Sequence, residues 1–325
     1  MQLSYISRIS PAIKLIGAVF LAGVMFGGLV CTEALAGIEA TYLYNLSNFN
    51  GRVPSFWAQI DVDEETNEIY VADTRGGDIR IFNDQGMEIF RFGDDGSLGS
   101  ILDVAVEPNG DILVLSRTIT RHTAIIRCNF KGEPLTTIDL KNLPADFSEF
   151  APDSMILRHA QLYLMDKTSL RLAVTDLDGN FKTGYDIAAL SNIAEDKRYS
   201  SEIGGFSVDR DGNMLFTVPV LFRALKLTPD GKVSGFGRPG SAPGRFGVIG
   251  GIVADDQGYY YVADRLKSVV LIFDKDFTFQ TEFGYRGRKP QNLIGPRNLG
   301  LDQNGRLYVS QLSNRGVSVF KITYK

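Results

Sequence analysis

Histidine and cysteine are scarce in this sequence. The 325 residues include two histidines, His122 and His159, and two cysteines, Cys31 and Cys128. A zinc site rich in imidazole needs three or four converging ligands, and a nucleophilic triad needs a histidine beside its serine or cysteine. Two histidines are too few for an imidazole-rich zinc site, and we expect neither of them to complete a nucleophilic triad.

A basic excess is also missing, since the net charge at pH 7 is −4. The cationic residues near the start belong to a different feature of the sequence. Arg8 and Lys14 precede an uncharged apolar stretch at 15–32, and the small-x-small sequence ALA follows at 34–36. This order is typical of an export signal. We predict that residues 1–36 are a signal peptide cleaved after Ala36.

Cleavage would leave 289 residues (325 − 36) in the periplasm or outside the cell, with membrane contact only during export. Two alternatives remain open. The 18 uncharged residues could form an uncleaved anchor, or Cys31 could be lipidated, although bulky Val30 stands where a small residue is expected.

The mature chain would carry a charge of 32 − 37 = −5. Nucleic-acid binders depend on neutralising phosphates, so we expect no nucleic-acid partner. Cys128 would be the only remaining cysteine, which excludes an intramolecular disulfide. It lies in the alternating segment IIRCNF, and we expect it to be a small buried hydrophobe.

Long helical periodicity is absent from residues 37–325, where 187–196 is the only modest helical candidate. Other segments, such as DVAVE, DILVLS and LTTIDL, alternate in polarity or are rich in β-forming residues. Turn glycines recur through them. One set is spaced by 46, 47 and 52 residues and another by 102, 46 and 47: Gly86, Gly132, Gly179, Gly231; and Gly110, Gly212, Gly258, Gly305. Such turns need a positive φ, which glycine adopts without steric cost.

A period of about 48 residues (289/6) in a β-rich chain predicts an all-β protein, a six-bladed β-propeller of four-stranded antiparallel blades. Residues 37–325 form the single propeller domain. The six blades are expected near 56–99, 100–148, 149–202, 203–246, 247–292 and 293–325.

The last unit is too short for four strands. The chain ends after VSVFKIT, whereas an additional strand, EATYLYNLS at 39–47, precedes the first unit. If this N-terminal strand completes the last blade, the ring closes without an exposed sheet edge. We predict that it does.

The residues at the ends of the repeated strands resemble those of a known family. The second strands end as YVAD at 70–73 and 261–264 and as YLMD at 163–166, and Phe-Gly pairs close the fourth strands at 92–93, 236–237 and 283–284. These features, with the inter-blade loop at 236–258, resemble the NHL-repeat six-bladed β-propellers of an exported bacterial type. The Asn-His-Leu triplet itself is missing. Trp57 is the only tryptophan and no Trp-Asp pair exists, which argues against a tryptophan-aspartate propeller.

The resemblance also suggests roles for particular residues. In such a fold the alternating Tyr, Val and Ala pack between blades, and the terminal Asp73, Asp166 and Asp264 accept backbone N–H bonds in the following loops. The two histidines would lie on opposite rims. That placement argues against the similar propeller lyases that depend on a histidine-bound metal.

A calcium site at the channel mouth is the alternative that the residues leave open. Aligning the blades places one residue of each first strand around the mouth: Gln59, Asp103, Ser154, Gly205, Gly251 and Asn298. Gln59, Asp103 and Asn298 could supply oxygen ligands for Ca²⁺, as in the gluconolactonase-like propellers. Asp103 is the only carboxylate of this ring, and the neighbouring Arg297 would repel a cation. The acidic run at 61–65 is expected to be a solvated hairpin turn.

Positive charge on the loop face is the second candidate site. The loops after the second strands and before the first strands carry Arg75, Arg117, Arg121, Lys167, Arg223, Arg265, Lys267 and Arg315. On an acidic protein, such a rim would attract an anionic partner. NHL propellers inside cells can bind RNA on this face, but an exported protein would meet a protein or another envelope component instead.

We therefore expect a non-enzymatic binding or assembly platform without a cofactor, engaging its partner through the loop face. The alternative is a Ca²⁺-dependent lactonase- or lyase-like enzyme that uses the channel mouth. The composition does not indicate an oligomeric state.

The export signal generates a first testable prediction. The secreted protein should begin at Gly37, because cleavage follows the small residue at the end of ALA. Intact-mass measurement decides this. A lipidated Cys31 or a retained apolar segment would contradict it.

Overall fold

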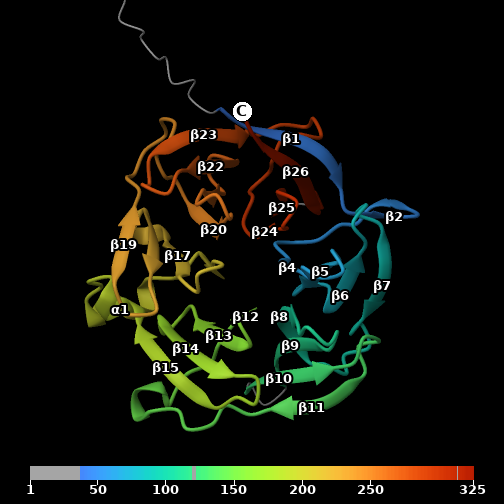
Figure 1. The fold of residues 1–325 in the computed structure, drawn as a ribbon, viewed down its shortest axis with the longest axis vertical. Helices are drawn as coiled ribbons and strands as arrows, with labels where there is room; N and C mark the ends of the chain where they lie inside the picture. Colours follow the sequence, from blue (N-terminus) through green and yellow to red (C-terminus); the bar gives the residue numbers. More distant parts are fainter. Residues whose placement is uncertain (1–36, 119–121, 313) are drawn as a thin grey trace, which may run out of the picture. The chain divides into compact units, whose positions relative to one another are not determined.

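The described part of the chain forms a ring of six blades. The computed structural model describes residues 37–118, 122–312 and 314–325. Six four-stranded antiparallel sheets surround a central channel (Figure 1), and the order of strands within each sheet follows the chain, apart from the last. The predicted fold class is confirmed.

The first three blades have the following strands. Blade 1 contains β4 (Gln59–Val62), β5 (Ile69–Asp73), β6 (Asp78–Phe82) and β7 (Glu88–Phe92). Blade 2 contains β8 (Ser100–Val106), β9 (Ile112–Arg117), β10 (Thr123–Cys128) and β11 (Pro134–Ile138). Blade 3 contains β12 (Ser154–Arg158), β13 (Gln161–Asp166), β14 (Arg171–Asp176) and β15 (Phe181–Asp186).

The remaining blades are built in the same way. Blade 4 contains β16 (Gly205–Val208), β17 (Met214–Val218), β18 (Arg223–Leu227) and β19 (Val233–Phe236). Blade 5 contains β20 (Ile249–Ala254), β21 (Tyr260–Asp264), β22 (Val269–Phe273) and β23 (Phe279–Gly284). Blade 6 contains β24 (Leu299–Leu301), β25 (Arg306–Ser310), β26 (Val317–Tyr324) and β1 (Ile38–Asn45).

Strand β1 closes the ring as predicted. It pairs antiparallel with β26 from Ile38↔Tyr324 to Asn45↔Ser318 and so supplies the fourth strand of blade 6. The side chain of Asn45 strengthens this pairing, since its Nδ2 donates to Ser318 Oγ at 2.9 Å. A two-stranded hairpin, β2 (Ser47–Asn48) and β3 (Gly51–Arg52), then leads to blade 1.

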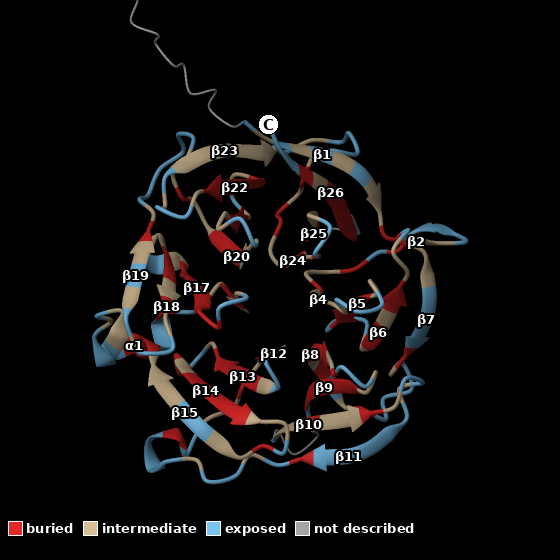
Figure 2. Ribbon diagram, in the orientation of Figure 1, coloured by how far each residue is buried: buried red, intermediate tan, exposed pale blue. Residues whose placement is uncertain are grey.

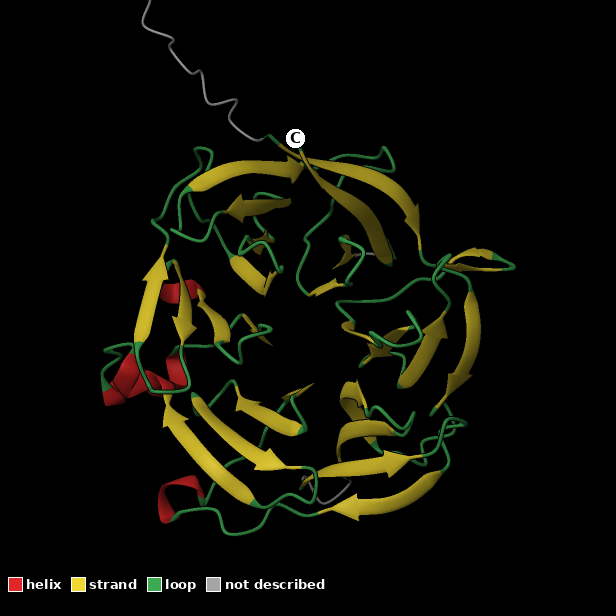
Figure 3. Cartoon of the chain, in the orientation of Figure 1, coloured by secondary structure: helices red, strands yellow, loops and turns green. Residues whose placement is uncertain are grey.

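Among the residues that the structure describes, helix is confined to short segments, shown red in Figure 3. They are η1 (Ala145–Phe147), α1 (Ile187–Leu190), η2 (Glu195–Ser200) and η3 (Pro219–Leu221). The helical candidate at 187–196 is thus a single α-helical turn followed by a 3-10 helix. No helix among the described residues is long and apolar enough to cross a bilayer.

The core lies between the blades, because alternate residues of a strand face opposite sides of its sheet. Tyr70 and Ala72 of β5 pack in a cluster with blade 2, whereas Ile69 and Val71 pack with Tyr308 of blade 6. Burial is concentrated in the middle strands of each blade, whereas the outer strands β7 and β11 are mostly exposed and β15 is mostly intermediate (Figure 2). Cys128 is fully buried in one of these clusters, as predicted, and burial raises its pKa to about 11.

The aspartates that end the second strands hold loops together. Asp264 accepts hydrogen bonds from the backbone N–H groups of Leu266 and Lys267 and, across the blade junction, from Gly247 and Val248. Asp73 and Asp166 accept similar bonds from the loops that follow them. Their predicted structural role is confirmed.

Ring closure generates a stability prediction. Removing residues 37–45 together with the leader should expose the edge of β26 and the apolar side chains that Ile38, Ala40 and Tyr42 cover. We expect a loss of about 3 kcal/mol, which lowers the melting temperature by roughly 5–10 °C. A protein beginning at Gly37 is the matched control, and equal melting temperatures would contradict closure by β1.

Candidate functional site

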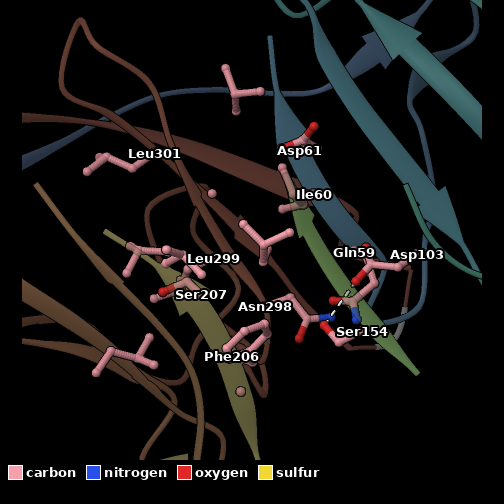
Figure 4. A pocket seen from close by; sticks show the side chains of 18 of the residues that line it. Gln59, Ile60, Asp61, Asp103, Ser154, Phe206, Ser207, Asn298, Leu299 and Leu301 are labelled. Atoms are coloured by element: carbon pink, nitrogen blue, oxygen red, sulfur yellow. Dashed lines mark hydrogen bonds between the residues drawn. The ribbon is translucent and has the colours of Figure 1, made fainter. Parts of the chain in front are cut away.

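The first strands of all six blades line a cavity of about 110 Å³ in the central channel. The six residues that aligning the blades with one another placed around one mouth all line this cavity. Figure 4 shows Gln59, Asp103, Ser154 and Asn298 gathered at one end of this cavity, with Asp61 and Leu301 toward the other. The structure thus brings together residues that are up to 239 positions apart in the chain (298 − 59).

Asp103 is the buried centre of this group, but its oxygens are already engaged. Its Oδ2 accepts hydrogen bonds from Ser154 Oγ and Met155 N, both at 3.0 Å, and its Oδ1 accepts from Val104 N at 2.9 Å. Burial raises its pKa to about 6, against the opposing effect of the Lys167 ammonium. Asp103 therefore joins the first strands of blades 2 and 3.

Asp61 is a second carboxylate in the cavity, and the sequence analysis missed it. The expected solvated turn at 61–65 is wrong at this residue, because β4 continues to Val62 and the two-residue period puts Asp61 on the same face as Gln59. Its Oδ2 accepts from Val106 N at 3.1 Å. Burial, together with the charge of Asp103, raises the pKa of Asp61 to about 7.

Glycines occupy the ring in blades 4 and 5, because the backbones there approach closely. A Cβ atom on Gly205 would lie 2.4 Å from Gly251 Cα, and one on Gly251 would lie 2.6 Å from Arg297 O. The N–H of Gly251 also donates to Arg297 O, which joins blades 5 and 6 directly. Any side chain at these two positions would force the backbones apart.

The ring does not fit a calcium ion. Asn298 turns its Nδ2 toward the carbonyl oxygens of Trp57 and Ala58, at 2.7 and 3.1 Å, and so holds a loop. Two of the six positions have no side chain, and Lys167 places an ammonium near the Asp103 carboxylate. A hard dication usually gathers several charged oxygens. Within 37–118, 122–312 and 314–325, no cluster of three or more His, Cys, Asp or Glu could hold a metal.

Asp153 and Lys167 form an acid–base pair at the mouth. Asp153 directly precedes the ring residue Ser154, and its Oδ1 lies 3.7 Å from Lys167 Nζ. This oxygen is buried and accepts no hydrogen bond from the described residues. Burial raises the pKa of Asp153, while Lys167 and Arg117 oppose the shift. One oxygen of this carboxylate therefore has no hydrogen-bond donor, although it lies next to the Lys167 ammonium.

Aromatic and cationic side chains surround the same mouth. The guanidinium carbon of Arg297 lies 4.9 Å from the ring centroid of Trp57, and that of Arg265 lies 5.5 Å from it. Arg75 stands 5.1 Å from the ring of Phe56, which contacts Trp57 at a centroid distance of 4.9 Å. Sequence analysis assigned no role to the two aromatic residues, because nothing in the repeat pattern distinguishes them from core residues.

Much of the predicted basic rim is occupied by structural contacts. Arg223 donates to Gly235 O at 2.8 Å, and Arg315 donates to Asn292 O at 2.7 Å. Lys267 pairs with Glu282 at 2.8 Å, in a pair whose side chains are 12% and 6% exposed. Lys167 lines the channel cavity instead of the outer loop surface.

Three other cations of the predicted face have exposed or partly exposed side chains: Arg75, Arg117 and Arg265. Arg121 lies outside the described residues. Arg223, Lys267 and Arg315 are also partly exposed, but they bind groups of their own chain. Binding of an anionic partner by this face stays a prediction. The sequence showed how many cations the loops carry but not which backbone carbonyls they would reach.

Solved structures confirm the architecture. The fold is similar to that of a streptogramin B lyase, with a TM-score of 0.59 and 14% identity over 88% of this chain and 97% of that one. It is also similar to a regucalcin from Agrobacterium tumefaciens described as a calcium-binding protein (TM-score 0.59, 13% identity, 86% and 95% covered). A gluconolactonase from Xanthomonas campestris is a third (TM-score 0.57, 12% identity, 83% and 87% covered).

At these identities the likeness shows the fold alone, a six-bladed propeller of the kind found in gluconolactonases and virginiamycin lyases. No protein-family model matches the chain, and no curated protein matches it. The fold implied by the NHL resemblance is confirmed, whereas membership of the NHL-repeat family stays a hypothesis.

The buried carboxylates generate a pH prediction. An acid whose folded pKa is raised contributes stability that is present below its unfolded pKa and lost as pH rises through the folded value. For Asp61, with a pKa raised from 3.8 to about 7, stability should fall between pH 4 and 8. Asp61→Asn keeps an oxygen acceptor for Val106 N but carries no charge.

The Asp61→Asn protein should therefore match the wild type near pH 4 and melt a few degrees higher near pH 8, corresponding to at least about 1 kcal/mol. Thermal denaturation across this range measures the difference. Asp196→Asn, at a side chain that is 75% exposed, is the control and should show no such divergence. Parallel curves for wild type and Asp61→Asn would contradict the prediction.

Proposed function

We propose that this protein is an enzyme of the lactonase or lyase type, acting on a small molecule at the end of the channel where Trp57 lies. The observation that carries the proposal is the Asp153–Lys167 pair, whose carboxylate has a buried oxygen without a hydrogen-bond donor. If the export signal functions, the reaction takes place in the envelope or outside the cell.

Asp153 is suited to accept a proton. A general base works best when its pKa lies near the operating pH, and burial shifts Asp153 in that direction. In lactone hydrolysis, Asp153 would take a proton from water as the water oxygen attacks the carbonyl carbon. The ring C–O bond then breaks, and the proton is delivered to the alkoxide. In an elimination, Asp153 would remove the proton from carbon while the leaving group departs with the bonding electrons.

Lys167 is the matching cation. Its ammonium is largely buried, with 12% of the side chain exposed, and lies 3.7 Å from Asp153. A positive charge in a partly desolvated site stabilises negative charge that develops on a substrate oxygen. The two groups together provide proton transfer and charge stabilisation without a metal ion. The ring residues do not fit Ca²⁺, so no step is assigned to one.

Two further observations favour an enzyme over the binding platform that the sequence suggested. Arg223, Lys267 and Arg315 of the predicted binding face are engaged by their own chain. Similar solved structures include a streptogramin B lyase, a gluconolactonase and a luciferin-regenerating enzyme. These names support an enzymatic role, although the low identities leave the substrate open.

The experiment is a turnover assay on purified protein. Gluconolactone, γ-butyrolactone, dihydrocoumarin and a streptogramin B antibiotic are offered, with ring opening followed by proton release or by mass spectrometry. Asp153→Asn should lower the rate for any accepted substrate by about 10²–10⁴-fold, the usual contribution of a general base. Lys275→Gln, at a side chain that is 74% exposed, should leave the rate unchanged.

Two results would contradict the proposal. If the Asp153→Asn protein melts like the wild type and its turnover rate stays within threefold of the wild-type rate, the general base is a different residue. If no ring is opened and a purified envelope protein binds in a manner abolished by Arg75→Glu with Arg117→Glu, the platform function replaces the enzymatic one.

A further inference from the structure

Two arginines share one indole ring at the channel mouth. Arg265 comes from the β21–β22 loop and Arg297 from the segment before β24, and both guanidinium groups lie within 5.5 Å of the Trp57 centroid. Like charges repel each other at such a site unless a counter-charge is present. Contact with an aromatic face offsets only part of this cost.

The intramolecular counter-charge is weak. Glu202 approaches Arg297 with an N–O distance of 3.7 Å, and its side chain is 70% exposed. An exposed pair of this kind contributes little. Burial lowers the pKa of Arg297, and the charge of Arg265 lowers it further, against the effects of Glu202 and Asp153. The site therefore holds a partly desolvated positive charge that an added anion would stabilise.

Trp57 is held firmly as the support for these cations. Its backbone adopts φ +53°, a left-handed conformation that is uncommon for a bulky residue. Its Nε1 donates to Gly295 O at 3.0 Å, and its carbonyl accepts from Asn298 Nδ2 at 2.7 Å. Backbone strain fixed by surrounding hydrogen bonds is found disproportionately at ligand-binding positions. The side chain is thus preorganised instead of being free to collapse onto the channel.

The arginine pair and the acid–base pair flank the channel mouth from different blades. Arg297 directly precedes the ring residue Asn298 of blade 6, as Asp153 directly precedes Ser154 of blade 3, and the charge of Asp153 acts on Arg297 across the channel. A substrate that spans the mouth would therefore reach Arg297 with one group and Asp153 with another.

We infer that Arg265 and Arg297, supported by Trp57, bind an oxyanion carried by the substrate, a carboxylate or a phosphate. Planar guanidinium groups recognise both of these anions through paired N–H donors. This inference rests on the proposed function, since it specifies the substrate class of that site. The enzyme would accordingly act on anionic lactones, esters or elimination substrates in preference to neutral ones.

Trp57 provides its own reporter, because it is the only tryptophan in the chain. Its fluorescence is followed while acetate, benzoate or inorganic phosphate is added at constant ionic strength, with benzamide as the neutral counterpart of benzoate. We expect a saturable change with at least one anion and none with benzamide. Saturation by benzoate and acetate alone assigns a carboxylate site, and saturation by phosphate alone assigns a phosphate site.

The variants separate binding from chemistry. Arg297→Gln and Arg265→Gln should each weaken the anion at least tenfold, and Arg297→Lys should weaken it less because the charge is kept. Arg288→Gln removes an exposed positive charge from the neighbouring inter-blade loop and should bind normally. Asp153→Asn should also still bind the anion, because it removes the base and leaves both arginines in place.

The inference is overturned if no anion gives a saturable change, or if Arg288→Gln weakens binding as much as Arg297→Gln. Turnover without anion binding would leave the proposed enzyme standing and remove its anionic substrate class. Anion binding without turnover would support the site and contradict the enzyme.

Discussion

The pairing of β1 with β26 is the contact on which the rest of the molecule depends. Each blade buries its two faces against its neighbours, so a ring of blades is stable only if the last blade is complete. Blade 6 obtains three strands from the C-terminal segment and the fourth from residues 38–45. This single sheet ties the two ends of the described domain together, and every first strand is thereby held around one channel.

The channel is asymmetric because its walls are built differently. Gly205 and Gly251 allow blades 4, 5 and 6 to approach through their backbones, whereas blades 1 and 2 project Gln59, Asp61 and Asp103 into the cavity. The charge of Asp103 adds to the cost of ionising Asp61, since both carboxylates line the same cavity. Asp103 accepts three hydrogen bonds, of which the two from Ser154 and Met155 fasten blade 3 to blade 2.

Charge at the mouth is distributed in a similarly uneven way. Cations further out, such as Lys267 and Arg315, are paired with carboxylate or carbonyl groups and hold inter-blade loops. Asp153, Arg265 and Arg297 are less completely paired although they are partly buried. Such groups lose hydration, and hydrogen bonds and ion pairs within the protein compensate for only part of this loss. A ligand that supplies the missing partner is therefore bound more tightly. The candidate site is the part of the propeller where such incompletely paired, partly buried charges occur together.

The propeller and its closure could be predicted from the sequence, because both follow from local rules. Turn glycines require positive φ, strands alternate with period two, and a missing outer strand at one end matched an unassigned strand at the other. The same alignment correctly identified the six residues around the channel, since first strands must converge on one axis. The loop-binding role of Asp73, Asp166 and Asp264 was also predicted, because each accepts hydrogen bonds from the loop that directly follows it.

Which of those residues remain available for chemistry depends on contacts that form when the blades pack together. Asp61 faces the cavity because β4 extends through it, Asn298 is occupied by the carbonyl of Trp57, and Lys167 turns inward to Asp153. The two arginines on Trp57 come from different blades. Contacts of this kind join side chains separated by up to 240 positions in the chain (297 − 57). Their geometry depends on the packing of whole blades, which no local pattern encodes.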